Sequence, residues 1–158
     1  MTDPTVTIPA PAFWLGWAGV IPFAGLTALS LFSTDSALGI SSGVVLQALI
    51  TYGTIILSFM GGVQWGLEMM RSDEDTPNAL GFAASVVPAL VAFGVSFVQP
   101  LVALMILALG FVGLLAYDVR RIKAGVGPRW YVGLRLQLST AVVLCLGAAV
   151  IAGLLSVA

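Results

Sequence analysis

Four polar residues stand out because each lies within or beside a long apolar run: Gln64, Glu68, Asp118 and Arg135. Gln64 and Glu68 are four residues apart, so on a helix they lie on the same side. Lipid offers a buried polar side chain no hydrogen-bond partner, and leaving the group unpaired is costly. Such residues therefore either hold neighbouring helices in register or line a polar pocket that opens to the cytoplasm. The sequence leaves both interpretations open.

Arg135 is the most unusual of these residues because it lies just inside an apolar run. A charged group near the centre of a transmembrane helix costs about 2.5–3.5 kcal/mol on insertion scales, so it should reach the interface or pair with an acid. Glu68 and Asp118 are the acids expected at the same side of the membrane. We therefore predict an ion pair of Arg135 with Glu68 or Asp118 that ties the second, fourth and fifth apolar segments together.

The residue types present exclude several kinds of chemistry. The chain has no histidine and one cysteine, so the usual zinc, haem and copper ligand sets are missing. A Ser-His-Asp or Cys-His nucleophile system is likewise excluded. Cys145 lies in the middle of an apolar run, where we expect an inert thiol. We predict a protein that is not an enzyme, with no catalytic residue, no metal and no cofactor. An acid–base pair of Glu68 and Asp118 would require both to face one cavity.

The composition is typical of a multi-pass helical membrane protein. Of 158 residues, 59% are hydrophobic and 8% are charged, whereas soluble domains have about 25% charged residues. The apolar residues come in runs of about 20, the length that a helix needs to cross a bilayer. We predict an all-α bundle of five transmembrane helices forming a single domain over residues 1–158. The expected spans are residues 13–32, 44–67, 79–98, 101–117 and 133–157.

The positive charges predict the orientation of this bundle. The six basic residues are Arg71, Arg120, Arg121, Lys123, Arg129 and Arg135. With five spans, they all fall on the side of the N-terminus, which places the N-terminus in the cytoplasm and the C-terminus outside. These basic residues can also meet anionic lipid headgroups. Residues 1–12 contain no basic residue, so we expect a lead-in rather than a signal peptide or a mitochondrial presequence. A bacterial inner membrane is thus expected rather than a mitochondrial one.

Small residues and aromatic residues suggest further structural roles. One helical stripe, with spacings of three and four, contains Thr54, Leu57, Gly61, Gln64, Glu68 and Arg71. The glycines Gly61, Gly62 and Gly66 predict close packing of a neighbouring helix, in preference to a ligand slot. Trp130 and Tyr131 are predicted to be anchors at the membrane interface.

Two sequence blocks resemble a known family. The first is Tyr52-Gly53-x-x-Ile56-Leu57-Ser58-Phe59-x-Gly61-Gly62-x-x-Trp65-Gly66. The second is Pro128-x-Trp130-Tyr131-x-x-Leu134-Arg135-x-x-Leu138. Together they resemble the signature of the domain-of-unknown-function 3429 family of transmembrane protein 69-like proteins. The resemblance covers nearly the whole chain and implies a small multi-pass protein of a bacterial or mitochondrial inner membrane. It implies no established activity.

Two functions compete at this level. Short connections, packing glycines and no catalytic group favour a non-enzymatic accessory, assembly or stabilising component of a membrane complex, with lipids and a larger complex or a second copy as partners. The polar residues favour a small carrier or binder of an amphipathic molecule, a quinone or a lipid. The connection between the fourth and fifth spans, residues 118–132, is basic and aromatic and favours the same function. That alternative requires a cavity that reaches Gln64 or Arg135. The net charge of −1 argues against nucleic acid as a partner.

Overall fold

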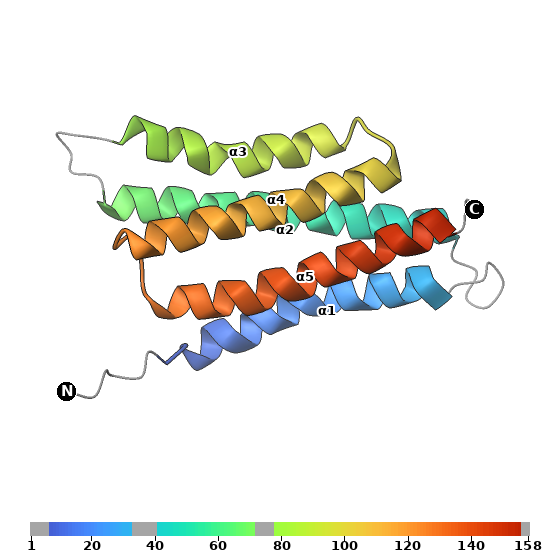
Figure 1. Ribbon diagram of the computed structural model, residues 1–158, viewed down its shortest axis with the longest axis horizontal. Coiled ribbons are helices and arrows are strands. Elements are labelled where there is room, and N and C mark those ends of the chain that lie inside the picture. Colours follow the sequence, from blue (N-terminus) through green and yellow to red (C-terminus); the bar gives the residue numbers. More distant parts are fainter. Residues whose placement is uncertain (1–6, 33–40, 72–77, 156–158) are drawn as a thin grey trace.

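Five antiparallel helices form one bundle in the computed structural model, which describes residues 7–32, 41–71 and 78–155 (Figure 1). The helices are α1 (Ala10–Phe32), α2 (Ser42–Arg71), α3 (Ala79–Val95), α4 (Pro100–Lys123) and α5 (Trp130–Leu155). Successive helices run in opposite directions, so the ends of α2 and α4 and the starts of α1, α3 and α5 meet at one end of the bundle. No strand occurs in the described ranges, and the all-α prediction is confirmed.

The helices extend beyond the apolar segments at the end that carries the charges. The predicted second and fourth spans stop at residues 67 and 117, but α2 continues to Arg71 and α4 to Lys123. Basic residues in the last turn of each helix favour this continuation, because they interact well with the partial negative charge of a helix C-terminus. The apolar run therefore predicts the part of the helix that suits lipid rather than the whole helix.

The tight connections have clear local causes. At the end of α3 the prediction was too long, because the helix ends at Val95 and three successive turns follow. Gln99 is extended, as residues before a proline prefer, and Pro100 opens α4. After α4, the amides of Gly125 and Val126 bond back to the carbonyls of Ile122 and Arg121. Gly125 takes the left-handed conformation with φ +84° that this type of helix ending requires.

The surface of the bundle is apolar, as expected of a protein that lies in lipid. Four helices (α1, α2, α4 and α5) are long and apolar enough to cross a membrane. The fifth, α3, is a shorter apolar helix of 17 residues. Every helix exposes large apolar side chains, for example Ile21, Ile55, Leu90, Leu109 and Leu144. Such a continuous apolar exterior has no place on a water-soluble monomer. The chain is an integral membrane protein.

Most of the core lies between α1, α2, α4 and α5, and α3, which packs against α2 and α4, adds Ala92 and Val95 to it. Phe23 of α1 and Phe111 of α4 meet edge to face at its centre, with ring centroids 6.0 Å apart. Two further glycines, Gly53 and Gly110, let α2 and α4 approach. A Cβ on Gly53 would lie 2.9 Å from Leu107, and a Cβ on Gly110 would lie 2.9 Å from Leu57. Helices α1 and α3 each contain an internal proline, Pro22 and Pro88, and each helix continues through it.

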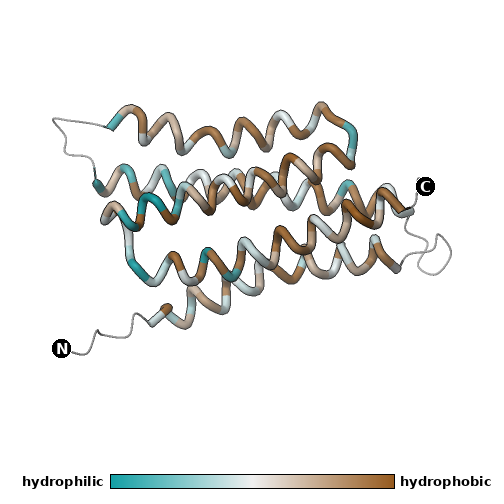
Figure 2. Tube along the Cα trace, viewed as in Figure 1, coloured by the Kyte–Doolittle hydropathy of each residue, from teal (hydrophilic) through white to brown (hydrophobic). Residues whose placement is uncertain are grey.

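Hydrophilic residues gather at one end of the bundle, where α2 and α4 end and α5 begins (Figure 2). All six basic residues of the chain belong to this end. Helix α1 also starts there, at Ala10, which lies within the lead-in expected over residues 1–12. Residues 1–6 and 156–158 lie outside the described ranges. The charge asymmetry predicted along the sequence is thus a spatial asymmetry of the bundle.

Candidate polar site

A buried ion pair joins three helices near the charged end. Arg135 of α5 donates from Nε to Oδ2 of Asp118 on α4 over 2.5 Å. The amide nitrogen of Gln64 on α2 donates to the other carboxylate oxygen of Asp118. Arg135 also donates from Nη1 to the sulfur of Met60 on α2, at 2.7 Å. All three polar side chains are buried, with exposed fractions of 2% for Gln64, 1% for Asp118 and 4% for Arg135.

A second ion pair lies closer to the end of the bundle. Arg121 of α4 pairs with the carboxylate of Glu68 on α2, and Glu68 is fully buried. Asn78, the residue before α3, donates to the other carboxylate oxygen of Glu68 over 2.7 Å. The Asn78 side chain also accepts a bond from the amide of Gly81 and so caps α3. This network therefore joins α2, α4 and the start of α3, which explains how the outer helix α3 is held at this end.

The structure brings together the four polar residues selected from the sequence, but in two networks. Arg135 pairs with Asp118 and not with Glu68, so the second of the two predicted partners is present. The ion pair ties α2, α4 and α5 together, as predicted, with Gln64 as the contribution of α2. Of the six residues of the predicted stripe, Leu57, Gly61, Gln64 and Glu68 are buried, whereas Thr54 is half-buried and Arg71 is exposed. Glu68 and Asp118 each pair with a different arginine, Arg121 and Arg135.

Two partners in these networks were not recognised in the sequence. Arg121 was expected to meet lipid headgroups together with the other basic residues, but its side chain is only 11% exposed and pairs with Glu68. Its position three residues after Asp118 could have indicated a common helix face. Asn78 was missed as well, although an asparagine directly before an apolar run is a typical helix cap.

A cavity lies beside Arg135, between α1, α2 and α5, with Phe111 of α4 at its wall. Its volume is about 160 Å³. Its wall is almost entirely apolar, and the polar residues on it are Arg135 and Ser139. Leu15 of α1 and Phe59 of α2 line the cavity and are themselves exposed on the outer surface, at 74% and 65%. The cavity therefore opens sideways between α1 and α2, toward the lipid acyl chains that would surround the bundle.

Two residues on the wall of this cavity carry polar atoms that lack hydrogen-bond partners. Nη2 of Arg135 and the hydroxyl of Ser139 are buried and unpaired among the described residues. Ser139 is 2% exposed and lies four residues, or about one turn, after Arg135 on α5. Buried donors of this kind cost free energy unless something bonds to them, and a bound water, ion or ligand is one explanation for them in native proteins. The arrangement can accept a polar group inside an otherwise apolar cavity.

The glycines of α2 do not all face the bundle. A Cβ on Gly61 would lie 2.8 Å from the carbonyl oxygen of Ser85 in α3, so this glycine does allow close packing. At Gly62 and Gly66 a Cβ would meet nothing within 4 Å. No described residue of this chain packs closely at Gly62 or Gly66, so the close packing predicted there stays a prediction. One residue step on a helix turns the side chain by about 100°, which takes Gly62 from the α3 side to the outside.

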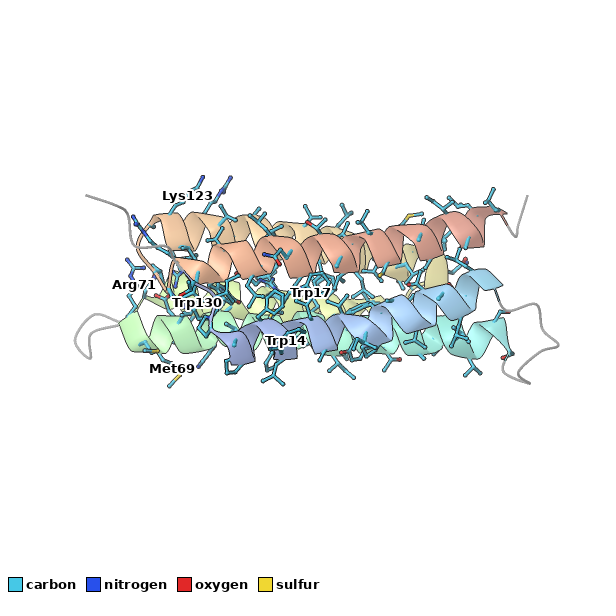
Figure 3. All side chains as sticks on the ribbon, turned by 90° about the horizontal axis from the view of Figure 1, so that it is seen from below. Trp14, Trp17, Met69, Arg71, Lys123 and Trp130 are labelled. Atoms are coloured by element: carbon cyan, nitrogen blue, oxygen red, sulfur yellow. The ribbon has the colours of Figure 1, made fainter. Side chains whose placement is uncertain are left out.

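The aromatic residues predicted to be anchors lie at the first turn of α5, at the charged end. The Trp130 and Tyr131 rings meet edge to face at 6.0 Å, and the Tyr131 ring lies 6.0 Å from the Arg135 guanidinium carbon. Arg71 and Lys123 point away from the bundle at the same end (Figure 3). The anchor role of Trp130 and Tyr131 stays a prediction.

The comparison with protein families decides the relationship. The family described as "Protein of unknown function (DUF3429)" matches residues 8–151. The chain belongs to this family. The matched region includes all five helices up to the last turn of α5, and with them both ion pairs and the cavity. The resemblance inferred from the two sequence blocks is confirmed.

Named relatives agree with the membrane assignment. The chain is 33% identical over 142 residues to transmembrane protein 69 of Xenopus tropicalis, an alignment that covers 87% of this chain and 53% of the relative. It is 29% identical over 82 residues to transmembrane protein 69 of Mus musculus, which covers 52% of this chain and 31% of the relative. The chain thus spans about half the length of the Xenopus tropicalis relative and about a third of the length of the Mus musculus relative. No solved structure matches.

Proposed function

We propose that this member of the family binds an amphipathic molecule, a quinone or a lipid, in the cavity beside Arg135. The observation that carries the proposal is that Arg135 and Ser139, two residues that line an apolar cavity, each carry a buried polar atom without a partner, Nη2 and the hydroxyl. Small-molecule sites are typically apolar clefts with few, well-placed polar groups, and this cavity fits that description. The polar end of the ligand would lie at Arg135, and its chain would leave between α1 and α2.

A pair of glycine variants tests this function. Gly19 lines the cavity, and a Cβ there would meet only the Tyr52 hydroxyl, at 3.9 Å. Gly25 lies on the same helix, has nothing within 4 Å and is not part of the cavity wall. We expect protein purified from native membranes in mild detergent to carry one amphipathic molecule per chain, measured by mass spectrometry of an organic extract. Gly19→Leu should lose most of it, and Gly25→Leu should retain it. Equal retention by both variants would contradict the proposal.

A second candidate, an accessory or assembly role in a membrane complex, draws support from the outer face of α2. Gly62 is exposed, and both Gly62 and Gly66 leave open space on this face. Two glycines four residues apart let the backbone of another helix come close, and van der Waals packing is a main force between helices in lipid. A partner helix, from a larger complex or from a second copy, would lie there. Neither candidate requires an enzymatic activity.

The same proposal places the N-terminus in the cytoplasm of a bacterium and the C-terminus across the inner membrane. The basic end of the bundle supports this orientation, because Lys and Arg are retained on the cytoplasmic side. A fusion of alkaline phosphatase to the C-terminus should be active, since this enzyme works only outside the cytoplasm, and a green fluorescent protein fusion there should be dark. The reverse pair of results would place the basic end outside and overturn the orientation.

A further inference from the structure

The unpaired groups at the cavity indicate what the polar end of its ligand must offer. Nη2 of Arg135 can only donate, and the Ser139 hydroxyl carries one proton to donate. The other two guanidinium nitrogens of Arg135 are already occupied by Asp118 and Met60. The two residues that carry these donors lie about one turn apart on α5, and both line the same cavity. The matching ligand group is therefore a hydrogen-bond acceptor.

The charges around the cavity favour a neutral acceptor. Asp118 already compensates the positive charge of Arg135, and Glu68 compensates Arg121. The formal charges of these four groups sum to zero. A carboxylate or phosphate bound at Nη2 would add an uncompensated negative charge inside the membrane, which is strongly unfavourable. A carbonyl oxygen would accept the same hydrogen bonds without that penalty.

The size and the walls of the cavity favour a flat ring at this position. Its volume of about 160 Å³ is close to that of an engineered apolar cavity of about 150 Å³ that binds benzene. Three phenylalanines contribute to the wall: Phe23, Phe59 and Phe111. Aromatic side chains pack well against planar rings, face to edge or offset. Phe59 and Leu15 at the opening leave a path for an apolar tail into the bilayer.

We infer that the cavity holds the ring of a quinone, with one neutral carbonyl oxygen bonded to Arg135 Nη2 and the Ser139 hydroxyl and with the tail leaving between α1 and α2. This inference rests on the proposed function and narrows its ligand class. It concerns binding alone and involves no electron transfer. The ion pair with Asp118 acts as the selectivity element, because it fixes Arg135 while cancelling its attraction for anions.

A set of probes with matched tails tests the inference. Decylubiquinone offers a neutral carbonyl on a ring, methyl decanoate a neutral carbonyl without a ring, and decanoate and decyl phosphate an anionic acceptor. Binding is measured by calorimetric titration of the protein in phosphatidylcholine nanodiscs, and Gly19→Leu protein supplies the background from partitioning into lipid. We expect decylubiquinone to bind at least about tenfold more tightly than either anion or methyl decanoate.

Two variants separate ligand binding from a structural role. Ser139→Ala should weaken decylubiquinone binding about fivefold, the effect of one lost hydrogen bond. It should not lower the thermal stability of the empty protein, because the hydroxyl has no partner there. Asp118→Asn should shift the binding preference toward decyl phosphate, since the positive charge of Arg135 is then no longer compensated. If this variant does not fold, the probe series and Ser139→Ala still decide.

The possible results test the quinone inference and the proposed binding of an amphipathic molecule separately. If decanoate or decyl phosphate bound the native protein more tightly than decylubiquinone, the quinone inference would be overturned, but the proposal of an amphipathic ligand would remain. Equal binding of methyl decanoate and decylubiquinone would overturn the role of the ring. If no probe bound above the Gly19→Leu background while a native molecule still co-purified, the quinone would be excluded. If none bound and none co-purified, the proposed function itself would fail.

Discussion

Replacing Asp118 with asparagine is expected to lower the free energy of unfolding by about 3–5 kcal/mol, because it leaves a buried arginine without its counter-charge. Asp118 is 1% exposed and Arg135 is 4% exposed, so neither group can be solvated instead. The asparagine keeps the size of the side chain, and the loss reports the charge rather than a cavity. Unfolding in detergent micelles, followed by circular dichroism, measures the effect.

A double variant shows whether the loss arises from the unpaired charge. In Asp118→Asn with Arg135→Met, both charges are gone and the long side chain is retained, so more than half of the lost stability should return. Arg120→Met is the matched control, since Arg120 is an exposed arginine on the same helix as Asp118, and it should change stability by no more than about 0.5 kcal/mol. A double variant as unstable as the sum of the single variants would show that the ion pair is not the cause.

Gly61→Ala should destabilise the bundle by about 1–3 kcal/mol, the usual effect of overpacking a well-packed contact. The added Cβ would lie 2.8 Å from the carbonyl oxygen of Ser85 and 3.2 Å from Cβ of Pro88. Backbone and proline atoms cannot turn aside as a flexible side chain can, so α3 must move away from α2. The same unfolding measurement in detergent records the change.

The neighbouring residue provides the control for Gly61. Gly62→Ala adds its Cβ into open space and should be neutral or stabilising by up to about 1 kcal/mol, since alanine is the better helix former. Equal losses at Gly61 and Gly62 would show that α2 is rotated relative to the arrangement described here. In native membranes Gly62→Leu also tests the accessory role, because it should release a partner helix while the chain remains stable.

The two sequence blocks that resemble the family lie close together in the bundle. Both sequence blocks contribute to one region of the bundle: Phe59 from the first lines the cavity, and Arg135 and Leu138 from the second lie on its opposite wall. The first block also supplies Tyr52, whose hydroxyl donates to the carbonyl of Gly19 over 2.9 Å and joins α1 to α2. Two segments far apart in the sequence thus build the walls of one site.

The sequence by itself determined the membrane class, the five helices and the end at which the charges meet. Apolar runs of bilayer length define the helices, and short connections force them to alternate in direction. Residues near the end of α2, the end of α4 and the start of α5 must then lie at the same level. For this reason the sequence alone is sufficient to group Gln64, Glu68, Asp118 and Arg135.

Only the tertiary structure decided which acid meets Arg135, which glycine of α2 faces inward and where the cavity lies. Helices that are apolar on all sides carry little pattern to indicate which face meets lipid and which meets protein, so their rotation about the axis is not encoded in the sequence periodicity. Rotation places Asp118 toward α5 and Arg121 toward Glu68 although both lie on one helix. It also leaves the space beside Arg135 unfilled, because that space depends on how three helices pack at once.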